Sequence, residues 1–273
     1  MKTITLKQAN EINFNRASVA LGTFDGLHRG HNALIQAALK YVGDTVAFTF
    51  DTLPISVFKQ QHRPMQLFTM QEKIEAFSKT GIDYLCVAHF DKDFAGLTRD
   101  EFETLLIDTF NPDNIIAGYN YTFGKDAEGT ADVLTQDVKK LGCNVDVISK
   151  VLVNGNDVSS TKIREYLWDG DITNANNLLG YQFFITGEAH ELTDKNSAQT
   201  TINIDVPQKK ISPRNGSYNV MVKVNENLYD AVCTVDIKNG VSEERSVKVD
   251  IQDIKEDVAG EIVTVVFKER LSD

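Results

Sequence analysis

The positions of apolar residues divide the chain into two parts with different periods. In the first part, short apolar runs, which are typical of buried strands, alternate with segments in which apolar residues recur every three or four positions, as in helices. Two of these helical segments start with a capping box, formed by Thr69 with Glu72 and by Thr98 with Glu101. The alternation predicts an α/β domain with a mainly parallel sheet and helices on both faces. The predicted strands lie at residues 18–21, 45–50, 84–88, 114–117 and 145–148.

After residue 183, apolar and polar residues mostly alternate, and β-branched residues are common. This period of two predicts antiparallel strands, and Asn215-Gly216 and Asn239-Gly240 mark turns between them. We therefore expect a small antiparallel barrel or sandwich over residues 183–273, after an α/β domain over residues 1–182. The predicted strands lie at residues 183–187, 200–205, 217–224, 230–237, 245–251 and 261–267.

Length, hydropathy and charge narrow the class of protein. The 273 residues are enough for two ordinary domains, and the mean hydropathy of −0.24 is typical of a soluble chain. The sequence has neither an apolar run of membrane-spanning length nor a signal-peptide core, and its three cysteines are widely spaced. We therefore expect a cytoplasmic protein with reduced thiols and no membrane partner. The formal net charge of −11 argues against a nucleic-acid partner, so a site for a polyanion must build its positive potential locally.

Between the first predicted strand and a helical pattern over residues 32–42, the chain reads Gly-Thr-Phe-Asp-Gly-Leu-His-Arg-Gly-His, from Gly22 to His31. Its glycines let backbone N–H groups approach a ligand closely, and a helix N-terminus favours negative charge. The imidazoles of His28 and His31, three residues apart, face the same way. This arrangement is suited to binding a nucleoside triphosphate. The alternative is a glycine-rich surface turn with two solvated histidines.

A second candidate anion site lies at Ser-Ser-Thr-Lys-Ile-Arg, where another helical pattern starts at residue 159. Hydroxyl residues at a helix start are often N-caps, which explains one of the serines. Capping does not explain why Arg164 follows one turn later, on the same face as Ser160 and Thr161. Spare hydroxyls and a guanidinium at a helix N-terminus indicate a second anion clamp.

Two further segments follow predicted strands and lie at the same expected edge of the sheet. Gly-Tyr-Asn-Tyr-Thr-Phe-Gly, at residues 118–124, places Asn120 where it can bind a ribose or a phosphate; the alternative is an ordered loop with packed aromatic side chains. Asp51 and Pro54 follow another strand and could line the pocket of a second substrate. No metal-ligand spacing is present, and the histidines at 62, 89 and 190 have no partners at useful spacing.

Together these motifs resemble those of the prokaryotic bifunctional riboflavin kinase/FAD synthetase family, over essentially the whole chain. The resemblance implies a Rossmann-like nucleotidyltransferase domain that transfers AMP from ATP to FMN, giving FAD and pyrophosphate, with Mg²⁺ carried on the triphosphate. His28, His31 and Arg164 then correspond to the catalytic residues. The remaining ATP-site residues implied by the resemblance are Gly22, Phe24, Gly26, Asn120, Ser160 and Thr161. Thr52 stands where the family usually has proline, on the flavin side of the pocket, where Asp51 and Pro54 lie.

The second part departs further from the family. The kinase motif with glycines, an arginine and a proline corresponds to residues 194–203, where only Thr201 and Asn203 survive. The glutamate that serves as the catalytic base of the kinase corresponds to Lys248. We therefore predict an FMN adenylyltransferase with a riboflavin-kinase-like barrel that has lost its activity. Two alternatives remain open: a nucleotidyltransferase for another phosphorylated acceptor, and a non-catalytic flavin-binding or regulatory protein.

Overall fold

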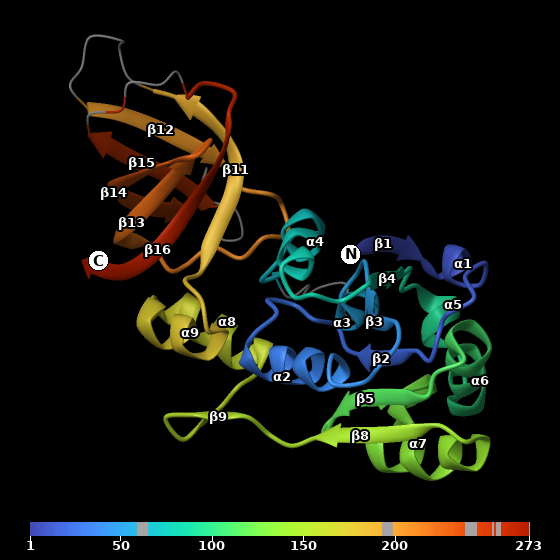
Figure 1. The fold of residues 1–273 in the computed structure, drawn as a ribbon. Coiled ribbons are helices and arrows are strands. Elements are labelled where there is room, and N and C mark those ends of the chain that lie inside the picture. The colour runs from blue at the N-terminus through green and yellow to red at the C-terminus, as the bar shows by residue number, and fades with distance from the viewer. Residues whose placement is uncertain (59–64, 193–198, 238–244, 253, 255–257, 273) are drawn as a thin grey trace. The chain divides into compact units, whose positions relative to one another are not determined.

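The computed structural model describes residues 1–58, 65–192, 199–237, 245–252, 254 and 258–272. The chain forms two compact units, and both are drawn in Figure 1. The first unit contains Met1–Pro64 and Met70–Leu152, and the second contains Met65–Thr69 and Val153–Asp273. The chain therefore passes between the units three times.

The first unit is built on a six-stranded sheet in which every neighbouring pair is parallel, with the order β1-β4-β3-β2-β5-β8. This confirms the predicted parallel sheet, and all five predicted strands are present with ends within one residue of the prediction. The strands are β1 (Lys2–Thr5), β2 (Ser18–Leu21), β3 (Thr45–Phe50), β4 (Tyr84–Ala88), β5 (Asn114–Gly118) and β8 (Asn144–Ile148).

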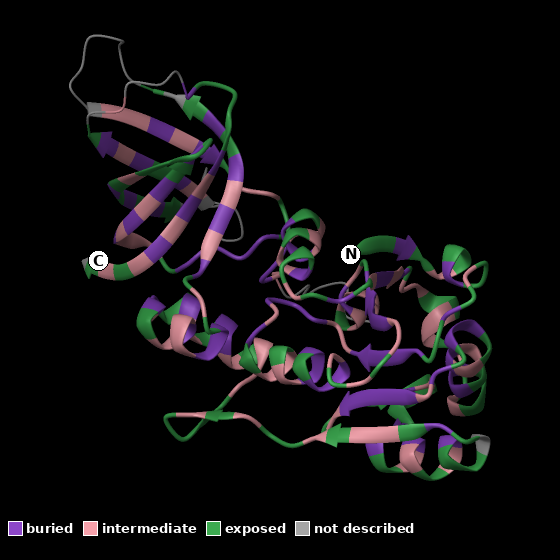
Figure 2. Ribbon diagram, in the orientation of Figure 1, coloured by how far each residue is buried: buried purple, intermediate pink, exposed green. Residues whose placement is uncertain are grey.

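Helices cover both faces of this sheet. The evidence comes from its central strands, in which neighbouring residues belong to different apolar clusters. Val19 and Leu21 of β2 share one cluster with Phe102, whereas Ala20 shares another with Ile35. Figure 2 shows the fully buried central strands. The helices of this unit are α1 (Leu6–Ala9), α2 (Arg29–Ala38), α3 (Pro54–Phe58), α4 (Met70–Ser78), α5 (Lys92–Ala95), α6 (Arg99–Phe110) and α7 (Ala131–Val138), with 3₁₀ turns at Lys125–Ala127 and Lys139–Leu141.

Helix α2 differs from the predicted helix over residues 32–42. It begins three residues earlier because His28, which is not a usual N-cap residue, caps it, and it ends at Ala38. Val42, the last apolar residue of the pattern, is 79% exposed. At α6 the predicted capping box of Thr98 and Glu101 is confirmed. Helix α4 begins directly after Thr69, but the capping box predicted there stays a prediction.

The second unit contains a closed six-stranded antiparallel barrel with the order β11-β12-β15-β14-β13-β16, which decides between the predicted barrel and sandwich. Figure 2 shows the alternation of buried and exposed residues along these strands. The predicted turn at Asn239-Gly240 lies outside the described residues. The strands are β11 (Phe184–Glu191), β12 (Gln199–Asp205), β13 (Gly216–Val224), β14 (Asn227–Ile237), β15 (Arg245–Gln252) and β16 (Ile262–Ser272).

Two helices, α8 (Ser160–Asp169) and α9 (Ile172–Leu179), pack with this barrel. Ile163 of α8 and Leu178 of α9 belong to the same apolar cluster as the barrel interior. Judged by the packing of side chains, the second unit therefore begins well before residue 183. The functional boundary between residues 182 and 183 stays a prediction. A short ribbon of β9 (Leu152–Val153) and β10 (Asn156–Asp157) lies where the chain enters this unit.

The segment Met65–Thr69 is attached to the second unit by backbone and side-chain hydrogen bonds. Gln66 donates its N–H to the Lys209 carbonyl (2.6 Å) and accepts from the Ile211 N–H (2.9 Å). The ammonium of Lys210, which is 1% exposed, donates to the Leu67 carbonyl (2.7 Å). Leu67 is itself 1% exposed and lies in the core of the second unit, to which this segment belongs.

All three cysteines, Cys86, Cys143 and Cys233, are free and buried, as expected from their spacing. Burial raises the pKa of the Cys86 thiol to about 12, so this thiol stays protonated at neutral pH. Among the described residues, no helix combines the length and the apolar character needed to cross a membrane.

Candidate nucleotide-binding site

The chain leaves β2 at the carboxyl edge of the sheet and enters α2 through a tight turn. Three residues of this turn have positive φ angles: Phe24 (47°), Gly26 (81°) and Leu27 (35°). A positive φ is uncommon outside glycine, so the turn must be held by its surroundings. Phe24 is fully buried, and its ring meets that of Phe77 from α4 edge-on, with centroids 5.3 Å apart.

The turn delivers His28 and His31 to the start of α2 as a stacked pair. Their ring centroids are 3.6 Å apart and the planes differ by 12°. His28 Nδ1 accepts a hydrogen bond from the His31 backbone N–H (3.2 Å). A neutral imidazole that accepts at Nδ1 carries its proton on Nε2, so Nε2 of His28 is a hydrogen-bond donor. The structure therefore brings the two predicted histidines together at a helix N-terminus.

Sequence reasoning missed Lys73 of α4, which lies against the same turn. It is 5% exposed, and its ammonium donates to the carbonyl of Thr23 (2.9 Å). A lysine in a helical pattern is normally read as a solvated residue, so Lys73 was not predicted to be buried. The possible signal was its place one helical turn before the buried Phe77, on the same face of α4.

Asp51, the predicted flavin-side residue after β3, is bonded to the residue that follows the neighbouring strand β4. Its Oδ2 lies 2.6 Å from His89 Nδ1, and its Oδ1 accepts from the Phe90 N–H (3.2 Å). Burial raises the pKa of Asp51, but the hydrogen bonds from His89 and Phe90 outweigh it and hold that pKa below its ordinary value. The hydrogen bond to Asp51 in turn raises the pKa of His89.

His89, which has no partner at useful spacing in the sequence, is exposed and bonds to Asp51, 38 residues away. His190 also has a partner, since its Nε2 lies 3.1 Å from Asp205 Oδ2 on the paired strand. His62 lies outside the described residues. Pro54, the other predicted flavin-side residue, is the first residue of α3.

Asn120 lies exposed directly after β5, whose neighbour in the sheet is β2, so it shares an edge with the start of the histidine turn. The Tyr121 N–H donates to the Gly118 carbonyl (2.9 Å), which closes the loop. Phe123 is buried and packs on Phe102 of α6, with centroids 5.1 Å apart. Phe123 therefore serves packing, whereas Tyr119 and Asn120 are exposed.

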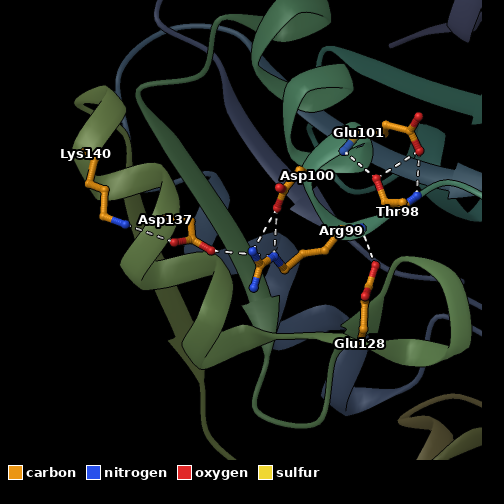
Figure 3. Close-up of polar contacts among 7 residues, drawn as sticks. All are labelled: Thr98, Arg99, Asp100, Glu101, Glu128, Asp137 and Lys140. Atoms are coloured by element: carbon orange, nitrogen blue, oxygen red, sulfur yellow. Dashed lines mark hydrogen bonds and ion pairs between the residues drawn. The ribbon is translucent and has the colours of Figure 1, made fainter.

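The hairpin after Asn120, made of β6 (Thr122–Phe123) and β7 (Gly129–Thr130), is fastened to the start of α6. Figure 3 shows that Glu128 reaches from the hairpin turn to α6, where it accepts the Arg99 N–H (2.7 Å). The Arg99 guanidinium in turn lies 3.8 Å from Asp137 of α7. This network gives the Asn120 loop a fixed base.

The second predicted anion clamp lies in the second unit. Ser159 is the N-cap of α8, since its Oγ accepts the Lys162 N–H (3.2 Å), and Ser160 and Thr161 are the first two residues of the helix. Arg164 is 8% exposed, and its Nε donates to the Met65 carbonyl (2.8 Å). The capping explanation therefore applies to Ser159 and not to the two hydroxyls predicted to bind phosphate.

The structure thus places the predicted residues in two groups, each held within one unit. The second group consists of Ser160, Thr161 and Arg164. The first group consists of Gly22, Phe24, Gly26, His28, His31, Asp51, Pro54 and Asn120. In the part of the chain that the structure describes, no three His, Cys, Asp or Glu side chains form a group that could hold a metal ion.

Thr201 and Asn203, which survive from the kinase motif, lie on the outer face of the barrel and are bonded to residues of the neighbouring strand β15. Thr201 Oγ1 donates to Asp250 Oδ1 (2.6 Å), and Ser246 Oγ donates to Asn203 Oδ1 (2.9 Å). Lys248 is exposed and lies opposite Asn203 in the register of β12 and β15. Residues 194–198 of the predicted motif lie outside the described residues.

Comparison with known proteins finds two family models that match successive parts of the chain. Residues 10–162 match the family model for FAD synthetase, and residues 179–273 match that for riboflavin kinase. The chain is 30% identical to a bifunctional riboflavin kinase/FMN adenylyltransferase of Bacillus subtilis, over 94% of this chain and 84% of that protein. The chain belongs to the bifunctional riboflavin kinase/FAD synthetase family.

Other members of the bifunctional riboflavin kinase/FAD synthetase family are similar over nearly the whole chain. The enzyme of Escherichia coli K12 is 27% identical over 93% of this chain and 83% of its own length. A crystal structure described as a macrolide-efflux protein of Streptococcus pneumoniae is 29% identical. It superposes with a TM-score of 0.86 over 99% of this chain and 91% of that chain. The α/β domain followed by a barrel is therefore the architecture of this family.

Proposed function

We propose that this chain is an FMN adenylyltransferase that has lost riboflavin kinase activity. Family membership makes it an ATP-dependent nucleotidyltransferase, with FMN as substrate and FAD as product. The observation that carries the proposed site is the stacked pair of His28 and His31 at the N-terminus of α2, inside the FAD synthetase domain.

The reaction needs no protein nucleophile. An oxygen of the FMN phosphate attacks the α-phosphorus of Mg-ATP, and the bond from that phosphorus to the β-phosphate oxygen breaks, so that its electron pair leaves with pyrophosphate. The protein contributes alignment and stabilisation of the charge that develops on the phosphate oxygens. In this proposal, the Nε2–H of His28, the imidazole of His31 and the N-terminus of α2 bind oxygens of the α- and β-phosphates.

The remaining residues hold the two ends of the reacting pair. Ser160, Thr161 and Arg164 bind the leaving pyrophosphate, because hydroxyls and a guanidinium at a helix start match its oxygens. Backbone groups from Gly22 to Gly26, together with Asn120, hold the nucleoside. Asp51 and Pro54 lie on the flavin side.

The proposed loss of kinase activity rests on residues at the outer face of the barrel. An ammonium cannot accept the proton of the 5′-hydroxyl of riboflavin, so Lys248 cannot replace the glutamate base. Thr201 and Asn203, which survive from the kinase motif, are hydrogen-bonded to Asp250 and Ser246. Both observations favour a barrel that keeps its fold without its reaction.

A product assay tests both parts of the proposal. The pure protein is incubated with ATP and Mg²⁺ plus either FMN or riboflavin, and the flavins are separated by chromatography. We expect FAD from FMN and no FMN from riboflavin. Production of FMN would contradict the loss of the kinase. Adenylylation of a different phosphorylated acceptor, or of none, would favour one of the two alternatives.

A variant of His31 tests the site itself. Without one preorganised donor to a developing charge, His31→Ala should lower kcat for FAD formation by roughly 10²–10³. Gln36→Ala, on the exposed part of the same helix, is the matched control and should leave kcat unchanged. If His31→Ala keeps kcat within about threefold of wild type, the direct role of His31 is wrong.

A further inference from the structure

We infer that Lys73 is a positioning residue for adenylyl transfer: by holding the carbonyl of Thr23, it fixes the turn that presents His28 and His31 to the phosphates. This inference rests on the proposed function of the histidine pair. Lys73 touches none of the proposed phosphate-binding side chains. Its effect on the reaction therefore passes through the backbone of the turn.

Three acceptors surround the ammonium of Lys73. One lies in the turn after β2, and two lie at the end of β3. They are the Thr23 carbonyl (2.9 Å), the Phe50 carbonyl (3.2 Å) and Thr49 Oγ1 (3.3 Å). The Thr49 hydroxyl also donates to the Thr23 carbonyl (3.0 Å). Three N–H donors thus meet three acceptors. Two of these bonds go to the end of β3 and one goes to Thr23, so Lys73 joins the strand to the start of the histidine turn.

The Thr23 carbonyl is a sensitive point, because the positive φ angles of the turn begin at the next residue. Phe24 has a φ of 47°, which costs free energy that neighbouring contacts must offset. Helix α4 supplies these contacts from two positions one turn apart, with Lys73 on the Thr23 carbonyl and Phe77 against the Phe24 ring. The Phe24 ring also contacts that of His31, with centroids 5.3 Å apart. A change at Thr23 is therefore transmitted directly to the histidine pair.

The positive charge of Lys73 adds an electrostatic effect. All three of its acceptors are neutral, and no carboxylate among the described residues lies within ion-pair distance of it. Asp25 in the turn and Asp51 after β3, the latter bonded to His89, act on it from further away. A chain with a net charge of −11 needs local positive potential for a triphosphate, and this buried ammonium supplies it beside the histidine turn.

Burial depresses the pKa of Lys73 to about 8, although Asp25 and Asp51 raise it. The ordinary value is 10.5, so between these values the unfolded chain holds a proton that the folded protein has lost. The free energy of unfolding therefore increases as the pH rises through this window. The folded protein is less stable when Lys73 is charged than when it is neutral. Activity should change in the opposite direction, because the neutral amine has one N–H fewer and no charge.

The substitution Lys73→Met in the full chain separates a positioning role from a structural one. We expect kcat for FAD formation to fall by about 10- to 100-fold, with a smaller change in KM for ATP, while the melting temperature is maintained. The wild-type rate should fall as the pH rises above about 8, and the variant should lack this fall. Lys79→Met is the control, because Lys79 is exposed and pairs with Glu75 on the same helix, and it should behave as wild type.

A second variant keeps the inference testable if Lys73→Met does not fold. Thr49→Val removes one acceptor of Lys73 and one donor to the Thr23 carbonyl, and it should lower kcat several-fold. Wild-type kcat and an unchanged pH profile in either folded variant would overturn the inference. A wild-type protein that forms no FAD would overturn the proposed function instead, so the two failures are distinguishable.

Discussion

His28 caps the helix that carries His31: its Nδ1 accepts the His31 N–H at 3.2 Å, and the two rings stack 3.6 Å apart. One imidazole therefore has a structural nitrogen, Nδ1, and a proposed functional one, Nε2. The cap fixes the tautomer, because an accepting Nδ1 leaves the proton on Nε2, where it can be donated to a phosphate. Substitutions of His28 can therefore separate its capping role from its proposed role in binding phosphate.

We predict different stability effects for two variants of His28. Asparagine is a strong N-cap, so His28→Asn should leave the free energy of unfolding nearly unchanged, whereas His28→Ala should lower it by about 1 kcal/mol. Both variants lose Nε2, so both should lower kcat for FAD formation by at least tenfold. Denaturant unfolding and steady-state kinetics measure the two effects. Near-normal kcat in His28→Asn would show that the residue is only a cap.

Arg164→Lys should be nearly as harmful to FAD formation as Arg164→Ala. The guanidinium donates from Nε to the Met65 carbonyl, and a lysine ammonium cannot reproduce the planar fork that a guanidinium offers to a pyrophosphate. We expect kcat/KM to fall by roughly 10²-fold in both variants. Lys162→Arg, on the exposed face of α8, is the control. Wild-type kinetics in Arg164→Lys would mean that only the charge matters.

Lys248→Glu alone should not restore riboflavin kinase activity. A general base contributes roughly 10²–10⁴ in rate, but only when ATP and its metal are already bound. The segment that corresponds to the phosphate motif lacks the family's glycines, so the two changes should be strongly non-additive. FMN production is measured for Lys248→Glu, for a graft of the family motif over residues 194–203, and for both together. A clear signal from the single substitution would show that the phosphate site is intact.

Glu103→Gln should stabilise the protein at pH 8 and have little effect at pH 5. Glu103 Oε1 is a buried atom without a hydrogen-bond partner among the described residues. Burial, and secondarily Asp137, raise the pKa of Glu103 from 4.5 to about 7. Between these values the folded state holds a proton that the unfolded chain has lost, so wild-type stability falls as the pH rises through this window.

Thermal unfolding of Glu103→Gln at both pH values checks this prediction, because glutamine is neutral throughout. Glu75→Gln, at an exposed carboxylate, should show no such difference between the two pH values. A melting temperature at pH 8 that equals or lies below that of wild type would contradict a buried, costly charge at Glu103.

The sequence predicted the strands of the sheet well because fully buried strands are continuous apolar runs, as in β2 and β3. It missed β1, since only Ile4 of this edge strand is buried. The start of α2 was misplaced because histidine is not a usual N-cap residue. Local patterns thus located the strands and the barrel. They misplaced the start of α2, where a histidine serves as the N-cap.

Long-range polar contacts were beyond the reach of sequence patterns. Lys73 meets Thr23 across 50 residues, and His89 meets Asp51 across 38 residues. Both contacts lie at the carboxyl ends of neighbouring strands, so the sheet order that brings them together has to be known first. The histidine turn, the Asn120 loop and the start of α8 were found because each is a contiguous motif.

The five residues Met65–Thr69 have a consequence for how this protein can evolve. They lie in the middle of the first unit's sequence, yet Leu67 is buried in the core of the second unit. A truncation after residue 152 would remove neighbours that cover Leu67 and Phe68 and would expose these apolar side chains to water. Loss of the barrel therefore has a cost in the part of the sequence that forms the first unit. Selection can stop maintaining the chemistry of the barrel while still preserving its interior, residue by residue, as a folding partner.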